Sequence, residues 1–209
     1  MTQIPSIDPA DSEDFTGAFR HIFGKMMQSV DGMLPAKVIS YNRTTNRATV
    51  QPLIMMLTTA DTTVQRATIA SVPVFQYGAG DFLLSFPLKV GDLGWIKAND
   101  RDISLFLQSY SNAAPNTIRK KSFSDAVFYP DVMRGYTIAG EDADNAVLQN
   151  LDGSVKISLG ADKIKITAPS VEIVSTTLTH NGVNIGDTHV HTQGADSGGD
   201  TQQNTGVPQ

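Results

Sequence analysis

The fold of this chain is decided by residues 155–187, which read VKISLGADKIKITAPSVEIVSTTLTHNGVNIGD. Apolar residues recur there every seven positions in two series, Ile157, Ile164, Val171, Leu178 and Ile185 in one, and Leu159, Ile166 and Ile173, continuing into His180, in the other. Coiled coils also repeat every seven residues, but their apolar residues stand three and four apart. Residues two apart face opposite sides of a helix and the same side of a strand. The repeat therefore predicts short β-strands.

Composition favours the same interpretation. Glycine or proline stands at five positions where either would weaken a helix, namely Gly153, Gly160, Pro169, Gly182 and Gly186. The segment is also rich in valine, isoleucine and threonine, which favour strands. We expect turns at residues 160–162 and 168–170.

A single copy of this repeat buries little surface. Each strand offers one narrow apolar face and leaves unpaired edges, and such repeats need neighbours to bury their faces. Three chains wound about a common axis would turn the apolar side chains inward and pair the edges. Residues 147–187 are therefore predicted to form an intertwined trimeric β-helix. A single-chain β-solenoid or a stack of hairpins is the alternative.

The repeat ends at a two-histidine motif, His189-Val190-His191. In a strand both imidazoles face one side, but two ligands are too few to hold a metal well. On a three-fold axis they become six nitrogens, which favour octahedral iron, nickel or cobalt over zinc. A saturated site of this kind is structural rather than catalytic. Because the ligands must be neutral, metal binding should weaken below about pH 6.

The other two histidines are predicted to have different roles. His180 occupies an inward-facing position of the repeat, as a core residue or as a second axial site. His21 stands alone in the N-terminal segment and is expected to be structural or exposed.

The segment before the repeat has the pattern of a small barrel. Six stretches between residues 34 and 110 have strand composition and flanking turn residues: 37–41, 48–53, 63–72, 82–86, 94–98 and 103–107. So many short strands predict an antiparallel barrel of the OB-fold type. OB-folds often bind nucleic acid, but the basic residues here are few and scattered, and the net charge is −5. We therefore expect no nucleic-acid partner.

Two further segments complete the chain. Residues 8–31 are predicted to form one amphipathic helix that starts at Asp8-Pro9 and carries its apolar residues three and four apart. It packs either on its own domain or on a partner subunit. The expected organisation is a mainly β chain with an N-terminal helical arm (1–32), an OB-fold-like barrel (33–110), a connector (111–146), the β-helix needle (147–187) and a metal-binding apex with a C-terminal tail (188–209).

Composition restricts the function further. The chain has no cysteine, which excludes disulfides and thiolate metal sites. The first residues lack the pattern of a signal peptide, and no apolar run is long enough to span a membrane.

The C-terminal motif resembles the central spike proteins of contractile-tail bacteriophage baseplates. The similar segment is Gly186-Asp187-Thr188-His189-Val190-His191-Thr192, followed by Gly194, Asp196-Ser197-Gly198-Gly199 and Gly206-Val207-Pro208. The order of an N-terminal region, a barrel and a β-helix that ends in H-x-H also matches. The resemblance covers most of the chain as architecture and the last twenty or so residues as motif.

The resemblance implies a homotrimer at the tip of the tail in the virion. It would dock under the baseplate hub protein and pierce the host outer membrane as the tail contracts. His189 and His191 would hold one iron ion per trimer. Some larger relatives carry a peptidoglycan-cleaving domain, which residues 111–146 are too short to house, so we expect no enzyme activity and no catalytic residues.

Two other functions compete with this hypothesis. A receptor-binding trimeric tail fibre or adhesin also uses β-helical trimers, but it would end in a broad head. A metalloenzyme would need an open metal position and a nearby general base.

Overall fold

The structure, a computed structural model, describes residues 14–58, 62–133, 135–201 and 203–206. The chain divides into two compact units, Met1–Tyr136 and Thr137–Gln209, and each is described by itself. The described elements of the first unit are the helices α2 (Phe15–Gln28) and α3 (Phe106–Ser109) and the strands β1 (Met33–Asn42), β2 (Arg47–Pro52), β3 (Met56–Leu57), β4 (Thr63–Val64), β5 (Ile69–Pro73), β6 (Tyr77–Ala79), β7 (Phe82–Leu84), β8 (Leu93–Asn99) and β9 (Ser122–Pro130).

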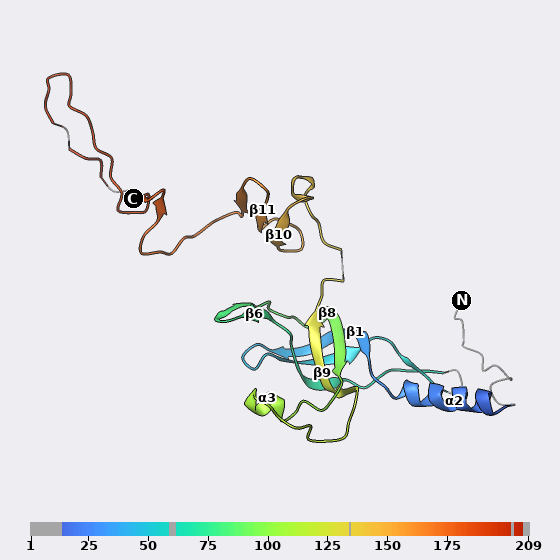
Figure 1. Ribbon diagram of the computed structural model, residues 1–209. Helices are drawn as coiled ribbons and strands as arrows, with labels where there is room; N and C mark the ends of the chain where they lie inside the picture. The colour runs from blue at the N-terminus through green and yellow to red at the C-terminus, as the bar shows by residue number, and fades with distance from the viewer. Residues whose placement is uncertain (1–13, 59–61, 134, 202, 207–209) are drawn as a thin grey trace. The chain divides into compact units, whose positions relative to one another are not determined.

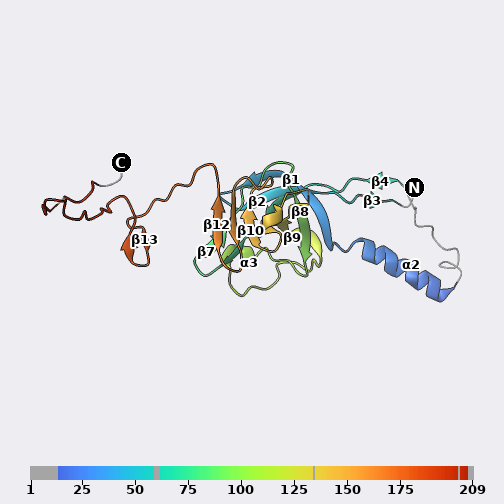
Figure 2. The ribbon, with the colours of Figure 1, turned by 90° about the horizontal axis from the view of Figure 1, so that it is seen from above.

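The centre of the first unit is a five-stranded antiparallel sheet in the order β5-β2-β1-β8-β9 (Figures 1 and 2). Its two ends approach each other, because Val74, just after β5, forms a parallel bridge with Phe128 of β9. The amide of Phe75 also donates to the carbonyl oxygen of Phe128 at 2.8 Å. The sheet is therefore a nearly closed barrel, and the predicted mainly β class with an antiparallel, barrel-like sheet is confirmed.

The barrel is filled by alanine, valine and isoleucine side chains together with two phenylalanines. The buried set is Ala36, Val38, Ala48, Val50, Val72, Val74, Ile96, Ala98, Phe123, Ala126 and Phe128. Phe128 is the largest of them and lies against Gly94 of the neighbouring strand, where any β-carbon would overlap the Phe128 ring and the Tyr129 carbonyl. Glycine at position 94 thus lets β9 approach β8 closely.

The structure differs from the expected connector over residues 111–146. Residues 122–130 are β9, which pairs with β8 and supplies Phe123, Ala126 and Phe128 to the barrel core. The barrel therefore needs a strand from beyond residue 110.

The predicted strand over residues 103–107 is wrong. The Asp102 carboxylate accepts from the Ser104 amide at 2.9 Å, and the Leu107 amide donates to the Ile103 carbonyl at 3.0 Å. This local turn leads into α3, so the alternation of Ile103, Leu105 and Leu107 does not mark a strand. The predicted strand over residues 63–72 is also divided, between β4 and β5.

Helix α2 confirms the described part of the predicted N-terminal helix. Asp14 caps its start, accepting from the Gly17 amide at 2.5 Å, and Ser29 caps its end, so that the helix stops at Gln28 rather than at residue 31. The expected start at Asp8-Pro9 lies outside the described residues. The apolar residues of α2 are exposed, which differs from a helix packed on its own domain.

The second unit holds two small sheets. The first consists of β10 (Ala146–Gln149), β11 (Lys156–Leu159) and β12 (Ile164–Thr167), which follow the 3-10 turn η1 (Gly140–Asp142). The second is a hairpin of β13 (Thr179–His180) and β14 (Val183–Asn184). The predicted strand character of the repeat is confirmed in β11 and β12, and the Gly160 amide donates to the Lys163 carbonyl in the expected turn between them. Residues 168–178 contain no strand, so the expected regular repeat is interrupted there.

Candidate metal centre and assembly surface

The β10–β12 sheet has an apolar face that is open to solvent. Cross-strand pairing sets Leu148 opposite Ile157, Ile157 opposite Ile166, and Leu159 opposite Ile164. The five large side chains of this ladder are between 39% and 69% exposed. These are the residues of the seven-residue repeat, joined by Leu148 of the preceding strand. Among the described residues of one chain, then, nothing covers the apolar face of the repeat.

The opposite face of the same sheet is polar, and it is the buried one. Lys156 and Ser158 of β11 lie within it, and Asp142, at the end of η1, is only 1% exposed. The Lys156 ammonium pairs with the Asp142 carboxylate, and the Ser158 hydroxyl donates to Asp142 Oδ1 at 2.6 Å. The side-chain amide of Asn145 donates through Nδ2 to Ser158 Oγ at 2.9 Å. Each buried polar group of this cluster therefore has a partner, as burial requires.

Two further groups extend this polar cluster towards the surface. Glu141 accepts from Lys156 Nζ at 3.2 Å and from Lys165 Nζ at 2.9 Å. The hydrogen bond from Lys156, followed by that from Ser158, lowers the pKa of Asp142 to about 2. The hydrogen bond to Asp142 in turn raises the pKa of Lys156. The pair is consequently ionised over the whole neutral range.

The cluster was not predicted from the sequence. Its signal is the alternation of Lys156 and Ser158 with Ile157 and Leu159, which shows that the second face of β11 is polar. Asp142 lies 14 residues before Lys156 and outside the repeat, so nothing local in the sequence identifies it as the partner.

Large apolar side chains stay exposed beyond the sheet as well. They continue along the described chain to the histidine motif, as Val171, Ile173, Val174, Val183, Ile185 and Val190. An apolar surface of such length is typical of a protein–protein interface rather than of a free monomer.

The two predicted metal ligands lie side by side. The ring centroids of His189 and His191 are 5.2 Å apart, with the ring planes at 88°. His189 Nδ1 lies 2.5 Å from the Gly186 carbonyl oxygen, which can only accept, so Nδ1 carries the proton. This leaves the lone pair of His189 Nε2 available for a metal. A backbone partner of this kind is the usual way in which proteins orient a ligating histidine.

The tail returns to this motif. The His191 amide donates to Thr205 Oγ1 at 2.9 Å, and the Thr205 amide donates to the His191 carbonyl at 3.0 Å. A turn around Asp196, whose carboxylate accepts from the Gly198 and Asp200 amides, lies between the two. The backbone at the second histidine is therefore tied to the tail that follows it.

Within one chain the two predicted metal ligands have no companions. Among the described residues, no group of three or more His, Cys, Asp or Glu side chains is placed to hold a metal ion. His180 belongs to the β13–β14 hairpin, and His21 lies exposed on α2. If His189 and His191 bind a metal as predicted, the described residues supply no third ligand of these types beside them.

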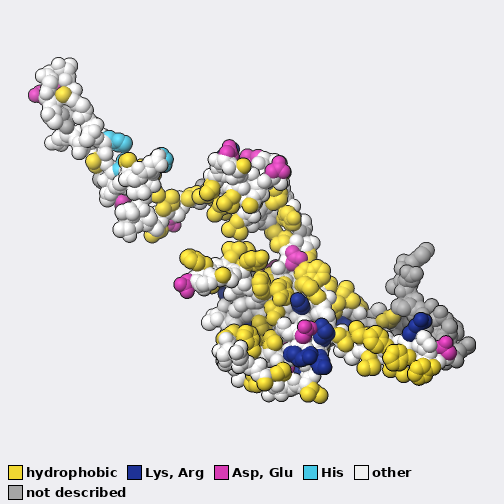
Figure 3. Space-filling view, in the orientation of Figure 1, with side chains coloured by type: hydrophobic (Ala, Val, Ile, Leu, Met, Phe, Trp, Pro, Cys, Tyr) yellow, Lys and Arg dark blue, Asp and Glu magenta, His cyan; other side chains and the backbone are white. Residues whose placement is uncertain are grey.

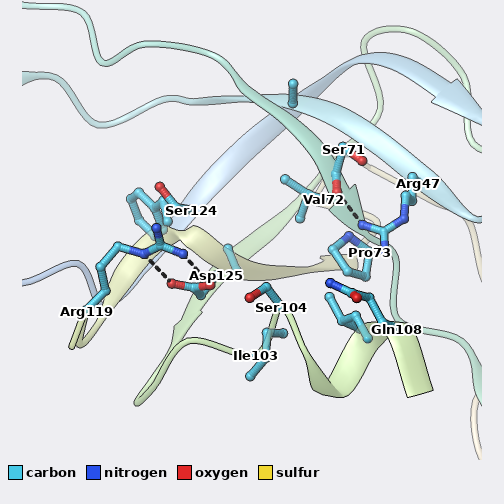
Figure 4. A pocket seen from close by; sticks show the side chains of 14 residues that line it. Arg47, Ser71, Val72, Pro73, Ile103, Ser104, Gln108, Arg119, Ser124 and Asp125 are labelled. Carbon is cyan, nitrogen blue, oxygen red and sulfur yellow. Dashed lines mark hydrogen bonds and ion pairs between the residues drawn. The ribbon is translucent and has the colours of Figure 1, made fainter. Parts of the chain in front are cut away.

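A separate polar cavity of about 370 Å³ lies between the barrel and the α3 segment (Figure 4). Two arginines line it. Arg47 donates to the Ser71 carbonyl at 2.7 Å, and Arg119 binds Asp125 and Asp102, each at 3.1 Å. Hydrogen bonds from Ser104 and Thr117 lower the pKa of Asp102. These charges fasten the loop between β8 and β9 to the barrel.

Comparison with known proteins identifies the barrel. Residues 34–131 match the family model described as the phage protein Gp138 N-terminal domain. This match supports a phage structural protein with a role in the virion. It spans the five-stranded sheet from β1 to β9, which agrees with β9 being part of the barrel. No curated protein matches the chain.

The described residues contain no helix long and apolar enough to cross a membrane.

Proposed function

We propose that this protein is the central spike of a contractile-tail phage baseplate. In this proposal three copies form a needle whose metal-clamped apex pierces the host outer membrane when the tail contracts. The observation that carries the proposal is the inverted burial of the β10–β12 sheet, which buries its polar face and leaves its apolar face exposed. We call it the reversed sheet. The match of the barrel to a phage protein domain supports the virion setting.

Three copies can bury the apolar face and pair the edges of the reversed sheet, which one copy leaves open. Around a common axis the three apolar ladders face one another and form a core, and fully burying a large apolar side chain contributes about 1.5–3 kcal/mol. β10 and β12 are the edges of the sheet, and each edge can pair with a neighbouring chain. The buried polar cluster then holds the opposite face of each sheet together at the outside of the needle.

The same axis completes the metal site. Three pairs of His189 and His191 provide six imidazole nitrogens, which suit one octahedral iron, or nickel or cobalt. A site that is filled by protein ligands has no position for water or substrate, so its role is to clamp the apex and the protein is not an enzyme. Chain ends ordinarily fray, and a tip under compressive load needs this clamp.

The barrel has the second role in this proposal. It sits under the baseplate hub and joins the needle to the rest of the tail. The similarity of residues 34–131 to a phage protein domain supports a role of the barrel in the virion, which this placement would give it.

The decisive experiment combines native mass and elemental analysis of the purified full chain. We expect a mass of three chains and one metal ion for every three chains. The matched control is His180→Ala, which removes a histidine outside the apex and should leave the metal content unchanged. A monomer, or one metal ion per chain, contradicts the proposal.

A further inference from the structure

Helix α2 presents an apolar stripe that nothing in the described chain covers. Phe15, Phe19, Ile22, Phe23 and Met26 follow one side of the helix, and their side chains are between 56% and 88% exposed. Figure 3 shows these hydrophobic side chains gathered along α2. A soluble protein seldom leaves three phenylalanines of one helix in water, so the stripe indicates an interface.

The helix also needs a partner in order to persist. It has 14 residues, about the length at which isolated helices are marginal in water. Gly17 and Gly24 lie inside it, and each costs about 1 kcal/mol relative to alanine. Its end caps, Asp14 and Ser29, are good but offset only part of this cost. Burial of the apolar stripe is the remaining source of stability.

The spacing of the stripe favours identical helices as the partner. Phe15, Phe19, Ile22 and Met26 stand four, three and four residues apart, which is the alternation of d and a positions in a heptad. Phe23 occupies an e position and widens the stripe. A stripe broader than the a and d seam suits a bundle of more than two helices. The opposite side carries Arg20, His21, Gly24 and Gln28, with Met27 as an apolar exception.

We propose that the α2 helices of three copies pack in parallel as a three-helix bundle. This inference rests on the trimer of the proposed function and adds a second assembly surface, N-terminal to the barrel. Three-fold symmetry makes the helices parallel and in register, because rotation about the axis maps each residue onto its own copy. The trimer would then be held at both ends of the chain, by helices before the barrel and by the β-repeat after it.

Another apolar segment is the competing occupant. The β3–β4 ribbon and the residues before it expose Leu53, Ile54, Met55, Met56, Leu57 and Val64. The α2 helix of one copy could lie on this ribbon of another copy. The experiment must therefore separate helix–helix contact from helix–ribbon contact.

Disulfide cross-linking can test this contact directly. The chain has no cysteine, so every thiol in a variant is an introduced one. Phe19→Cys and Met26→Cys put a thiol at two a positions one heptad apart in the full chain. A disulfide requires α-carbons within about 7 Å, so mild oxidation reports contact between the same residues of two copies. We expect both variants to form covalent dimers on a non-reducing gel, with two of the three chains of each trimer joined.

Gly24→Cys is the matched control. A side chain at position 24 meets no other atom within 4 Å, and the position faces away from the stripe. It should stay uncross-linked under the same oxidation. Equal cross-linking at position 24 would mean random collision of exposed thiols and would overturn the bundle.

Sedimentation of the same samples before oxidation separates the two proposals. A trimer in which neither Phe19→Cys nor Met26→Cys cross-links overturns the bundle and leaves the proposed function standing. A trimer in which Phe19→Cys cross-links only to an added Met56→Cys assigns the stripe to the ribbon and also overturns the bundle. Monomeric protein contradicts the proposed function itself, and the bundle with it.

Discussion

At the scale of single residues, the second unit is organised by one buried ion pair. Asp142 and Lys156 lie on the covered face of a small sheet, where Ser158 and Asn145 also donate to the Asp142 carboxylate and Glu141 also accepts from Lys156. An ion pair in such a place is costly to desolvate and damaging to break, because the partner that remains is a buried, unpaired charge. Its value here is that it holds the sheet together without using the apolar face.

The substitution Asp142→Asn tests this role. The introduced carboxamide can still accept from Ser158 but leaves Lys156 with the largely exposed Glu141 as its charged partner. We expect the melting temperature of the second unit, measured by circular dichroism, to fall by several degrees. Asp144→Asn, at an exposed position of the same turn, is the control and should melt like the parent. Equal melting of both variants would contradict the role of the pair.

The same pair sets a dependence on pH. The pKa of Asp142 is lowered from 3.8 to about 2 by its hydrogen bonds, so its ionised form stabilises the fold. That contribution is complete above about pH 4 and is lost as the pH falls through about 2. Lys156, whose pKa is raised above 10.5, loses its contribution only at more alkaline pH. The free energy of unfolding, measured between pH 5 and pH 2, should decrease with falling pH in the parent and decrease less in Asp142→Asn.

At the scale of elements, the β10–β12 sheet and helix α2 each have an apolar side that no described residue covers. In the β10–β12 sheet the buried side is polar and the open side carries Ile157, Leu159, Ile164 and Ile166. In α2 the open side carries three phenylalanines. Both elements are locally well formed, with paired strands in one and capped ends in the other. What they lack is another surface to pack against.

Ile166→Asp tests the sheet as an interface. The side chain is exposed in one chain, so the charge should leave the fold of the single chain intact. In three copies it would place three carboxylates on one axis, and we expect the assembly to fall to monomers in sedimentation. Lys163→Asp, in the turn that precedes β12, changes charge more strongly at an exposed site and should stay trimeric. An Ile166→Asp trimer would show that this face is not the interface.

The sequence predicted these elements where the pattern was local. The pair Ile157 and Leu159 marks β11, and the three- and four-residue apolar spacing marks α2, although the predicted start at Asp8-Pro9 lies outside the described residues. Prediction failed where the partner is distant. β9 joins the barrel by pairing with β8 and fitting Phe128 against Gly94, both distant in sequence, and residues 103–107 turn where Asp102 binds the Ser104 amide. Of the candidate site, the paired histidines were predicted, and the Asp142 cluster that supports the preceding sheet was not.

At the scale of the whole molecule, the barrel and the repeat support different parts of the proposed function. The barrel gives the chain its relationship to phage proteins, over residues 34–131. The second unit carries the features from which trimer and metal are proposed. Because His189 and His191 lie outside the β10–β12 sheet, the proposed metal site and the proposed assembly surface can be separated by mutation.

Replacing both His189 and His191 by Ala should make that separation. We expect the variant to lose its metal in elemental analysis and to remain trimeric in sedimentation, since the apolar ladders rather than the ion hold the chains. Its apex should become more open to protease, because the residues after the histidines lose their clamp. Dissociation of the trimer would instead assign the assembly to the metal.

The reversed sheet also has a consequence for the chain before it finds its partners. A newly made copy can fold this sheet at once, because the Asp142 cluster needs no other chain. The same copy then displays an apolar ladder between two open strand edges, a combination from which fibrous aggregates grow. If the protein assembles as proposed, association into trimers and growth of fibres would compete for this exposed face, and the slower the association, the more chain would be lost to fibres.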